Sequence, residues 1–138
     1  MRPLRDLLES GTLARGQGAF NVVGGLWPLV SMRSFEFVFG PKQDDWLVRT
    51  VGGLMISAGL VQLRAADSSA EANRLARQLG MGIAATFLTT ELVYVPAGRI
   101  RWTYLADAVM EAGWIAAWAL SGSRKPGLVR PHGPIECR

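Results

Sequence analysis

Two carboxylates stand four residues apart in the stretch TYLADAVMEAGW (103–114), whose other residues are apolar, aromatic or small. Asp107 and Glu111 share one face of a helix, because side chains four residues apart are neighbours on a helix surface. Acidic groups at this spacing can act as a general acid and base, or can bind a cation. An acidic pair is costly inside an otherwise apolar helix, so these residues are the first candidates for function.

Four long stretches with few charges must position these residues. They comprise residues 16–32, 46–63, 78–98 and 102–123. A helix of about 20 residues crosses a hydrocarbon core of roughly 30 Å, and aromatic residues gather near one set of the proposed helix ends, as they do at membrane interfaces. A soluble helical bundle is the alternative, but the last stretch lacks the polar stripe that a water-facing helix needs. The sequence therefore predicts an all-α protein, a four-helix transmembrane bundle.

The basic residues predict the orientation of this bundle. Ten of the 15 lysines and arginines fall on the face that carries both termini and the 64–77 connection. Since basic loops stay on the cytoplasmic side, both termini are expected to be cytoplasmic in a multi-pass protein of a bacterial inner membrane. Residues 1–138 are expected to form a single integral membrane domain with a flexible C-terminal tail at 124–138.

Two connections also carry local signals. The residues SFEFVF (34–39) are expected to form a short strand or an interfacial turn before Gly40-Pro41. Asp67 or Ser68 is expected to cap the following helix, with Glu71 in its first turn.

Four ionisable side chains fall at similar depths in the outer half of the spans. At a rise of about 1.5 Å per residue, the depths are roughly 5, 8, 9–10 and 14 Å for Arg49, Asp107, Glu91 and Glu111. A shared depth favours a polar cavity, although side chains of this kind can also cross-link helices structurally. Arg49 is expected to pair with Glu91 or Asp107. Glu111, the deepest, is expected to carry a proton because burial disfavours its charged form.

Aromatic residues on the same helix faces complete the predicted cavity. The candidate ligand-binding residues are Arg49, Glu91, Tyr94, Tyr104, Asp107, Glu111 and Trp114. For Trp114, packing between helices is the competing interpretation. The occupant is expected to be a small cationic or amphipathic, lipophilic ligand.

Several common activities lack the residues that they require. The single His132 and the single Cys137 both fall in the tail, so no metal site, redox pair or other cofactor site is expected. No glycine pair precedes GK[ST], which excludes a P-loop. The net charge of +4 is not arranged as a basic run with interleaved aromatic residues, so nucleic acid is not an expected partner.

The stretch MRSFEFVFGPKQDDWLVRTVG (32–52) resembles small bacterial four-span integral membrane proteins of uncharacterised activity. The resemblance covers most of the chain and implies the fold but no activity. The overall architecture is also similar to four-helix membrane proteins that bind sterols or other lipophilic amines through buried carboxylates. In that comparison Asp107 and Glu111 stand where the paired acids would be.

Three functions are compatible with these residues. The first is ligand binding in the carboxylate-lined cavity, associated with transport. The second is a membrane enzyme in which Glu111 is the general acid and Asp107 the base. The third is an accessory subunit whose charged face meets a membrane partner protein. The bilayer is an expected partner in all three, and a homo-oligomer is compatible with each of them.

Overall fold

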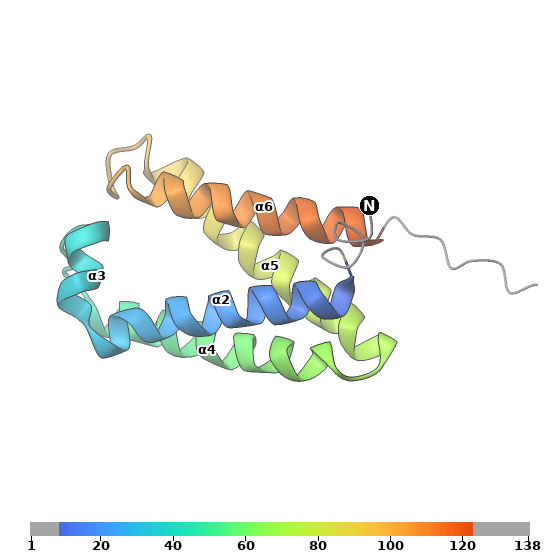
Figure 1. Ribbon diagram of the computed structural model, residues 1–138. Helices are drawn as coiled ribbons and strands as arrows, with labels where there is room; N and C mark the ends of the chain where they lie inside the picture. Colours follow the sequence, from blue (N-terminus) through green and yellow to red (C-terminus); the bar gives the residue numbers. More distant parts are fainter. Residues whose placement is uncertain (1–8, 123–138) are drawn as a thin grey trace, which may run out of the picture.

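The computed structural model describes residues 9–122, and the regular structure in this range is entirely helical (Figure 1). The five described helices are α2 (Ser10–Val30), α3 (Met32–Phe39), α4 (Asp45–Ala66), α5 (Ala70–Tyr94) and α6 (Tyr104–Gly122). The predicted all-α class is confirmed for this part of the chain. The tail predicted at 124–138 lies outside the described residues.

The four long helices run alternately in opposite directions (Figure 1). α2 packs mainly on α4, and α5 packs mainly on α6, which gives two helical hairpins. The start of α2, the 67–69 turn and the end of α6 lie together, and we call this region the turn end. α3 and the 95–103 loop lie at the opposite end, the α3 end.

Glycines allow α2 and α4 to approach until their backbones touch. A Cβ atom added at Gly25 would lie 2.4 Å from the carbonyl oxygen of Gly52. A Cβ added at Gly59 would lie 2.6 Å from the carbonyl oxygen of Gly18. Non-bonded atoms do not come this close, so α2 and α4 can pack at this distance only because glycine, which has no Cβ atom, occupies these positions. Small residues are what membrane helices use for such contacts.

The chain turns sharply between α2 and α3, where the helix direction bends by 109°. Ser31 begins α3 by accepting a hydrogen bond at Oγ from the main-chain N–H of Ser34. The strand or turn predicted for 34–39 is therefore wrong. Phenylalanines at every second position resemble a strand, but Phe35 and Phe39, four residues apart, lie on one side of a helix with ring centroids 4.9 Å apart.

The first turn of α5 differs by one residue from the prediction. Ser69, rather than Asp67 or Ser68, caps the helix by accepting a hydrogen bond from the N–H of Ala72 (3.2 Å). The helix begins at Ala70, so Ser69 occupies the capping position, whereas Asp67 ends α4 and forms a salt bridge with Arg15 of α2. Glu71 lies in the first turn of α5, as predicted.

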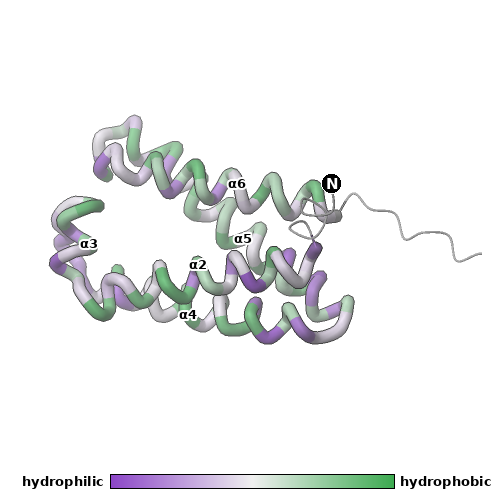
Figure 2. The backbone as a smooth tube through the Cα atoms, viewed as in Figure 1, coloured by the Kyte–Doolittle hydropathy of each residue, from purple (hydrophilic) through white to green (hydrophobic). Residues whose placement is uncertain are grey.

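Polar side chains occupy the interior, and apolar side chains cover much of the surface. Five of the six largest fully buried side chains are polar, namely Gln17, Asn21, Gln62, Glu91 and Glu111. Large apolar side chains are exposed on each of the four long helices. Figure 2 shows hydrophobic segments along α4 and α6, with hydrophilic ones near the turn between α4 and α5. A small apolar cluster that includes Leu13, Ala14 and Trp118 is also buried, so the interior combines apolar packing with an unusually large share of buried polar side chains.

One described helix, α4, is both long and apolar enough to cross a membrane. The bent pair α2–α3 would add a second, broken span, whereas α5 and α6 do not meet the same criterion. Helix length and composition thus identify one or two candidate spans within residues 9–122. They do not confirm the four-span bundle.

Candidate functional site

Three carboxyl groups come together between α5 and α6. Glu91 lies in the last turn of α5, while Asp107 and Glu111 lie in the first two turns of α6. The side chains of Glu91 and Glu111 are 2% and 1% exposed, and Asp107 is half-buried. The Glu91 and Asp107 carboxyl groups are within hydrogen-bonding reach of each other, and both are near enough to Glu111 for charge interaction. We call these three residues the carboxyl cluster.

The carboxyl cluster is poorly supplied with hydrogen-bond donors. All four carboxyl oxygens of Glu91 and Glu111 are buried, and no N–H or O–H group within residues 9–122 donates to them. Glu91 can bond to Asp107 only if one of the two carries a proton. An ionised carboxylate buried without a partner is very costly. A proton or a cation at the cluster would lower this cost.

Arg49 does not join the carboxyl cluster. Its side chain is exposed near the start of α4 and forms no salt bridge with Glu91, Asp107 or Glu111. Arg49 precedes Gly52 by three residues and so shares its side of α4, and Gly52 packs against Gly25 of α2 rather than against α5 or α6. The predicted ion pair is thus not formed, and the cluster has no compensating arginine there.

The geometry of the cluster does not match a metal centre. Within the described part of the chain, no three His, Cys, Asp or Glu side chains are placed to hold a metal ion. The two pockets found at the α3 end are not lined by Glu91, Asp107 or Glu111. The acidic groups are enclosed between helices, so a bound cation would have to be small or would have to part the helices to enter.

α3 packs against the end of α6 that carries the carboxyl cluster. Phe39 stacks on Tyr104 with ring centroids 4.6 Å apart, and the Lys42 ammonium lies 4.8 Å from the centre of the same ring. Burial lowers the pKa of Lys42, an effect that nearby Glu36 opposes. Arg101 and Thr103 donate hydrogen bonds of 3.0 and 2.8 Å to main-chain carbonyls of α3. Tyr104 is therefore a contact with α3 beside the cluster.

The remaining aromatic candidates lie apart from each other. Tyr94 is 47% exposed at the end of α5 and lines neither pocket. Trp114 packs on α2, where its ring centroid is 6.0 Å from that of Phe20. Its Nε1 is buried and has no hydrogen-bond acceptor among residues 9–122. Trp114 thus packs between helices and also leaves an unused donor one turn from Glu111.

A second buried polar group, which the sequence analysis missed, links all four long helices. The Oε1 atom of Gln17 on α2 accepts hydrogen bonds from Gln62 of α4 (2.9 Å) and Trp118 of α6 (2.7 Å). Its Nε2 donates to the carbonyl of Gly80 on α5 (2.9 Å). Asn21 donates to Gln62 (2.8 Å). The available signal was the spacing of Gln17 and Asn21, four residues apart in an apolar stretch. We call these five residues the amide network.

The two buried polar groups differ in how well they are satisfied. Gln17 and Gln62 are paired within the amide network, which is typical of a structural element, and in this network only Asn21 Oδ1 is buried without a donor among the described residues. Glu91 and Glu111 are not paired in this way. Buried groups left unsatisfied are often functional, so the carboxyl cluster is the stronger functional candidate.

Replacing Glu111 with methionine should raise the thermal stability of the protein. The change removes two buried oxygen atoms that lack donors and keeps a side chain of similar length, and unsatisfied buried groups cost about 1–3 kcal/mol each. Thermal unfolding in a mild detergent measures the effect. The exposed Glu71 provides the control variant Glu71→Met, which should change the midpoint little. If Glu111 instead stabilised the fold by cross-linking helices, Glu111→Met would lower the unfolding midpoint.

No protein-family profile matches this chain, and no curated protein or solved structure shows significant similarity to it. The carboxyl cluster, rather than any relative, therefore carries the functional proposal.

Proposed function

We propose that this protein is an integral membrane protein whose four long helices cross the bilayer and whose carboxyl cluster binds a small cationic or amphipathic ligand. The observation that carries the proposal is the burial of the four unpartnered carboxyl oxygens of Glu91 and Glu111. A cation that donates hydrogen bonds would supply what these oxygens lack.

The distribution of polar groups supports a bilayer as the surroundings. In lipid, ionisable and amide side chains turn inward, while apolar side chains face the hydrocarbon. In α6 the acidic residues Asp107 and Glu111 lower the hydropathy, and in α5 the polar residues of the first half, such as Arg74 and Arg77, lower it together with Glu91. Leu92, Val109 and Leu120 on these two helices are apolar and exposed. The 19 residues of α6 extend about 28 Å at the helical rise, close to the thickness of a hydrocarbon core.

The proposed location is a bacterial inner membrane, with the turn end toward the cytoplasm. The support is the basic excess along the whole sequence, in which ten of 15 basic residues fall on that face. The carboxyl cluster and α3 would then lie toward the outer surface. A ligand would approach from the outer leaflet.

Binding of n-butylammonium tests the proposed ligand chemistry. Added to the purified protein in mild detergent, it should raise the unfolding temperature in a concentration-dependent way. A ligand at one hundred times its Kd stabilises the folded state by about 2.7 kcal/mol. Neutral n-butanol, which has the same chain length, should give no comparable shift. Tetramethylammonium should also give little shift because it has no N–H group to donate.

Variants connect this effect to the carboxyl cluster. The double variant Glu91→Gln/Glu111→Gln should lose the response to n-butylammonium, whereas the exposed control Glu71→Gln should keep it. Equal responses in the wild type and in the double variant would contradict the proposal.

An accessory or self-associating role is the second candidate, favoured by glycines on the outer helix faces. A Cβ added at Gly53, Gly82 or Gly113 would meet nothing within 4 Å. Small residues on a lipid-facing surface allow another membrane helix to pack closely. Native mass spectrometry from mild detergent distinguishes a monomer, a homo-oligomer and a complex with a partner.

A further inference from the structure

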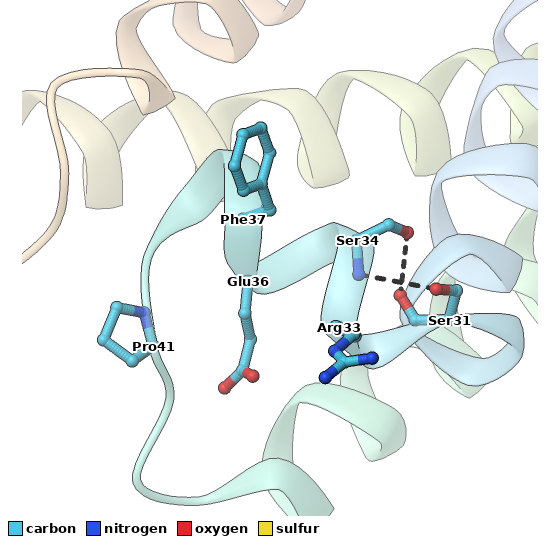
Figure 3. Close-up of a pocket in the computed structure, with 6 residues that line it drawn as sticks. All are labelled: Ser31, Arg33, Ser34, Glu36, Phe37 and Pro41. Carbon is cyan, nitrogen blue, oxygen red and sulfur yellow. Dashed lines mark hydrogen bonds between the residues drawn. The ribbon is translucent and has the colours of Figure 1, made fainter.

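A separate pocket lies on α3 (Figure 3), and no residue of the carboxyl cluster lines it. Its volume is about 550 Å³, and it is lined by Ser31, Arg33, Ser34, Glu36, Phe37 and Pro41. This volume falls within the range of roughly 300–1,000 Å³ that is typical of ligand sites. None of the residues predicted to bind a ligand lines it.

Arg33 and Glu36 give this pocket one positive and one negative group. Both side chains extend from the same side of α3, with Pro41 on the facing loop (Figure 3). They are one helical turn apart, but they form no salt bridge with each other, and Arg33 forms none with any residue in 9–122. The Oε1 atom of Glu36 accepts the main-chain N–H of Lys42 (2.8 Å), which orients the carboxylate. The Arg33 guanidinium is therefore free of a salt bridge, and the second oxygen of Glu36 accepts no hydrogen bond from the described residues, although the Lys42 ammonium lies close enough for charge interaction.

The pocket also has a hydroxyl donor and an apolar rim. The Oγ atom of Ser31 accepts the N–H of Ser34, and its own hydrogen has no acceptor in the described chain. Ser34 is already engaged, because its Oγ donates to the carbonyl of Ser31 (3.0 Å) and accepts from Trp27 (2.8 Å). The Phe37 ring is 83% exposed and points to the other side of α3 from Glu36 (Figure 3).

We propose that the pocket binds the headgroup of phosphatidylethanolamine, a lipid whose phosphate and ammonium groups match these charges. The phosphate lies against the Arg33 guanidinium and the Ser31 hydroxyl, and the ammonium donates to the free oxygen of Glu36. Phe37 contacts the acyl chains. The inference rests on the proposed membrane location but not on the carboxyl cluster.

The same chemistry discriminates against other common phospholipids. Phosphatidylglycerol has no ammonium group, so its phosphate would pair with Arg33 while the nearby Glu36 carboxylate would gain no cationic partner from the headgroup and would repel the phosphate. Phosphatidylcholine carries a quaternary ammonium that has no N–H group to donate. Specificity of this kind depends on a mismatch with the wrong lipid as much as on contacts with the right one.

Lipid retention tests the inference directly. The full chain is reconstituted into nanodiscs containing equal amounts of phosphatidylethanolamine, phosphatidylglycerol and phosphatidylcholine, and retained lipids are identified by native mass spectrometry. The wild type should retain phosphatidylethanolamine preferentially. Arg33→Gln should weaken that retention about tenfold or more, because a hydrogen bond to a charged group is lost. Glu36→Gln should shift the preference toward phosphatidylglycerol, since it removes the repulsion and can still accept the Lys42 N–H.

Matched variants control for the loss of a charge. Arg99→Gln and Asp44→Asn each remove an exposed charge at the same end of the molecule, and both should keep the wild-type preference. Melting temperatures of all four variants confirm that they are folded.

Three results would overturn the inference. They are equal retention of the three lipids by the wild type, an unchanged preference in both Arg33→Gln and Glu36→Gln, and binding of soluble phosphoethanolamine with no lipid retained. A chain that does not enter nanodiscs at all contradicts the membrane location itself. If the wild-type protein retains phosphatidylethanolamine preferentially but does not respond to n-butylammonium, only the proposed role of the carboxyl cluster is contradicted.

Discussion

Replacing Gln17 with leucine should destabilise the protein by about 3 kcal/mol or more. The substitution leaves buried N–H groups of Gln62 and Trp118 without their acceptor, and it removes a hydrogen bond to the carbonyl of Gly80, which still accepts a main-chain N–H within α5. Each buried group left unpaired costs about 1–3 kcal/mol. Because these groups belong to three other helices, the loss should loosen the contact between the two hairpins. Thermal or denaturant unfolding in mild detergent measures the change.

Two further variants show whether the amide network is responsible. Gln78 is an exposed glutamine on α5, so Gln78→Leu should have little effect. The double variant Gln17→Leu/Gln62→Leu should cost less than the sum of the single changes, because it removes two partners together. Wild-type stability in Gln17→Leu would show that the amide network does not hold the hairpins together.

Replacing Gly25 with valine should separate α2 from α4. The added Cβ would lie 2.4 Å from the carbonyl oxygen of Gly52, and the contact involves backbone, which cannot move aside without displacing a whole helix. Overpacking in a core commonly destabilises the folded state by about 1–3 kcal/mol, and a clash with backbone should destabilise it by an amount at or above the upper end of that range. The unfolding midpoint should fall steeply, and Gly25→Ala should show a smaller loss of the same sign.

Gly53 provides a matched control on the same helix pair. An alanine Cβ at this position meets nothing within 4 Å. Since alanine is favoured over glycine in a helix by about 1 kcal/mol, Gly53→Ala should be neutral or stabilising. Equal losses in Gly25→Val and Gly53→Ala would mean that close packing of α2 on α4 is not what the glycines provide.

The acidic residues could be predicted from sequence because charge is conspicuous in an apolar stretch. Depth along each helix then placed Glu91 near Asp107, since both lie close to the same ends of adjacent helices. Arg49 has a similar depth but does not reach them. Periodicity assigns a residue to a helix face, but it does not say which neighbouring helix that face will contact. The side of α4 that carries Arg49 and Gly52 packs against α2 because glycines allow the two backbones to touch there.

Other features lacked a distinct signal in the sequence. The amide network consists of uncharged residues, so a search for charges in apolar stretches passes over Gln17 and Gln62. The six residues 34–39 are too few to separate a period of 2 from a period of 3.6, and the capping contact of Ser31 favours the helix. Asp67, Ser68 and Ser69 are all good capping residues, so the sequence alone does not say which of the three stands directly before the first residue of the helix.

The position of the acidic groups has a consequence for biogenesis. An aspartate at the centre of a lone helix costs about 2.5–3.5 kcal/mol on insertion. Glu111 lies near the middle of α6, and α5 carries Arg74 and Arg77 in addition to Glu91 in its last turn, so each helix alone partitions poorly into lipid. Paired as a hairpin, the two helices enclose their carboxyl groups and present apolar side chains to the outside. In the proposed membrane location, α5 and α6 therefore leave the translocation machinery together, and synthesis of α6 sets the time at which α5 becomes stably inserted.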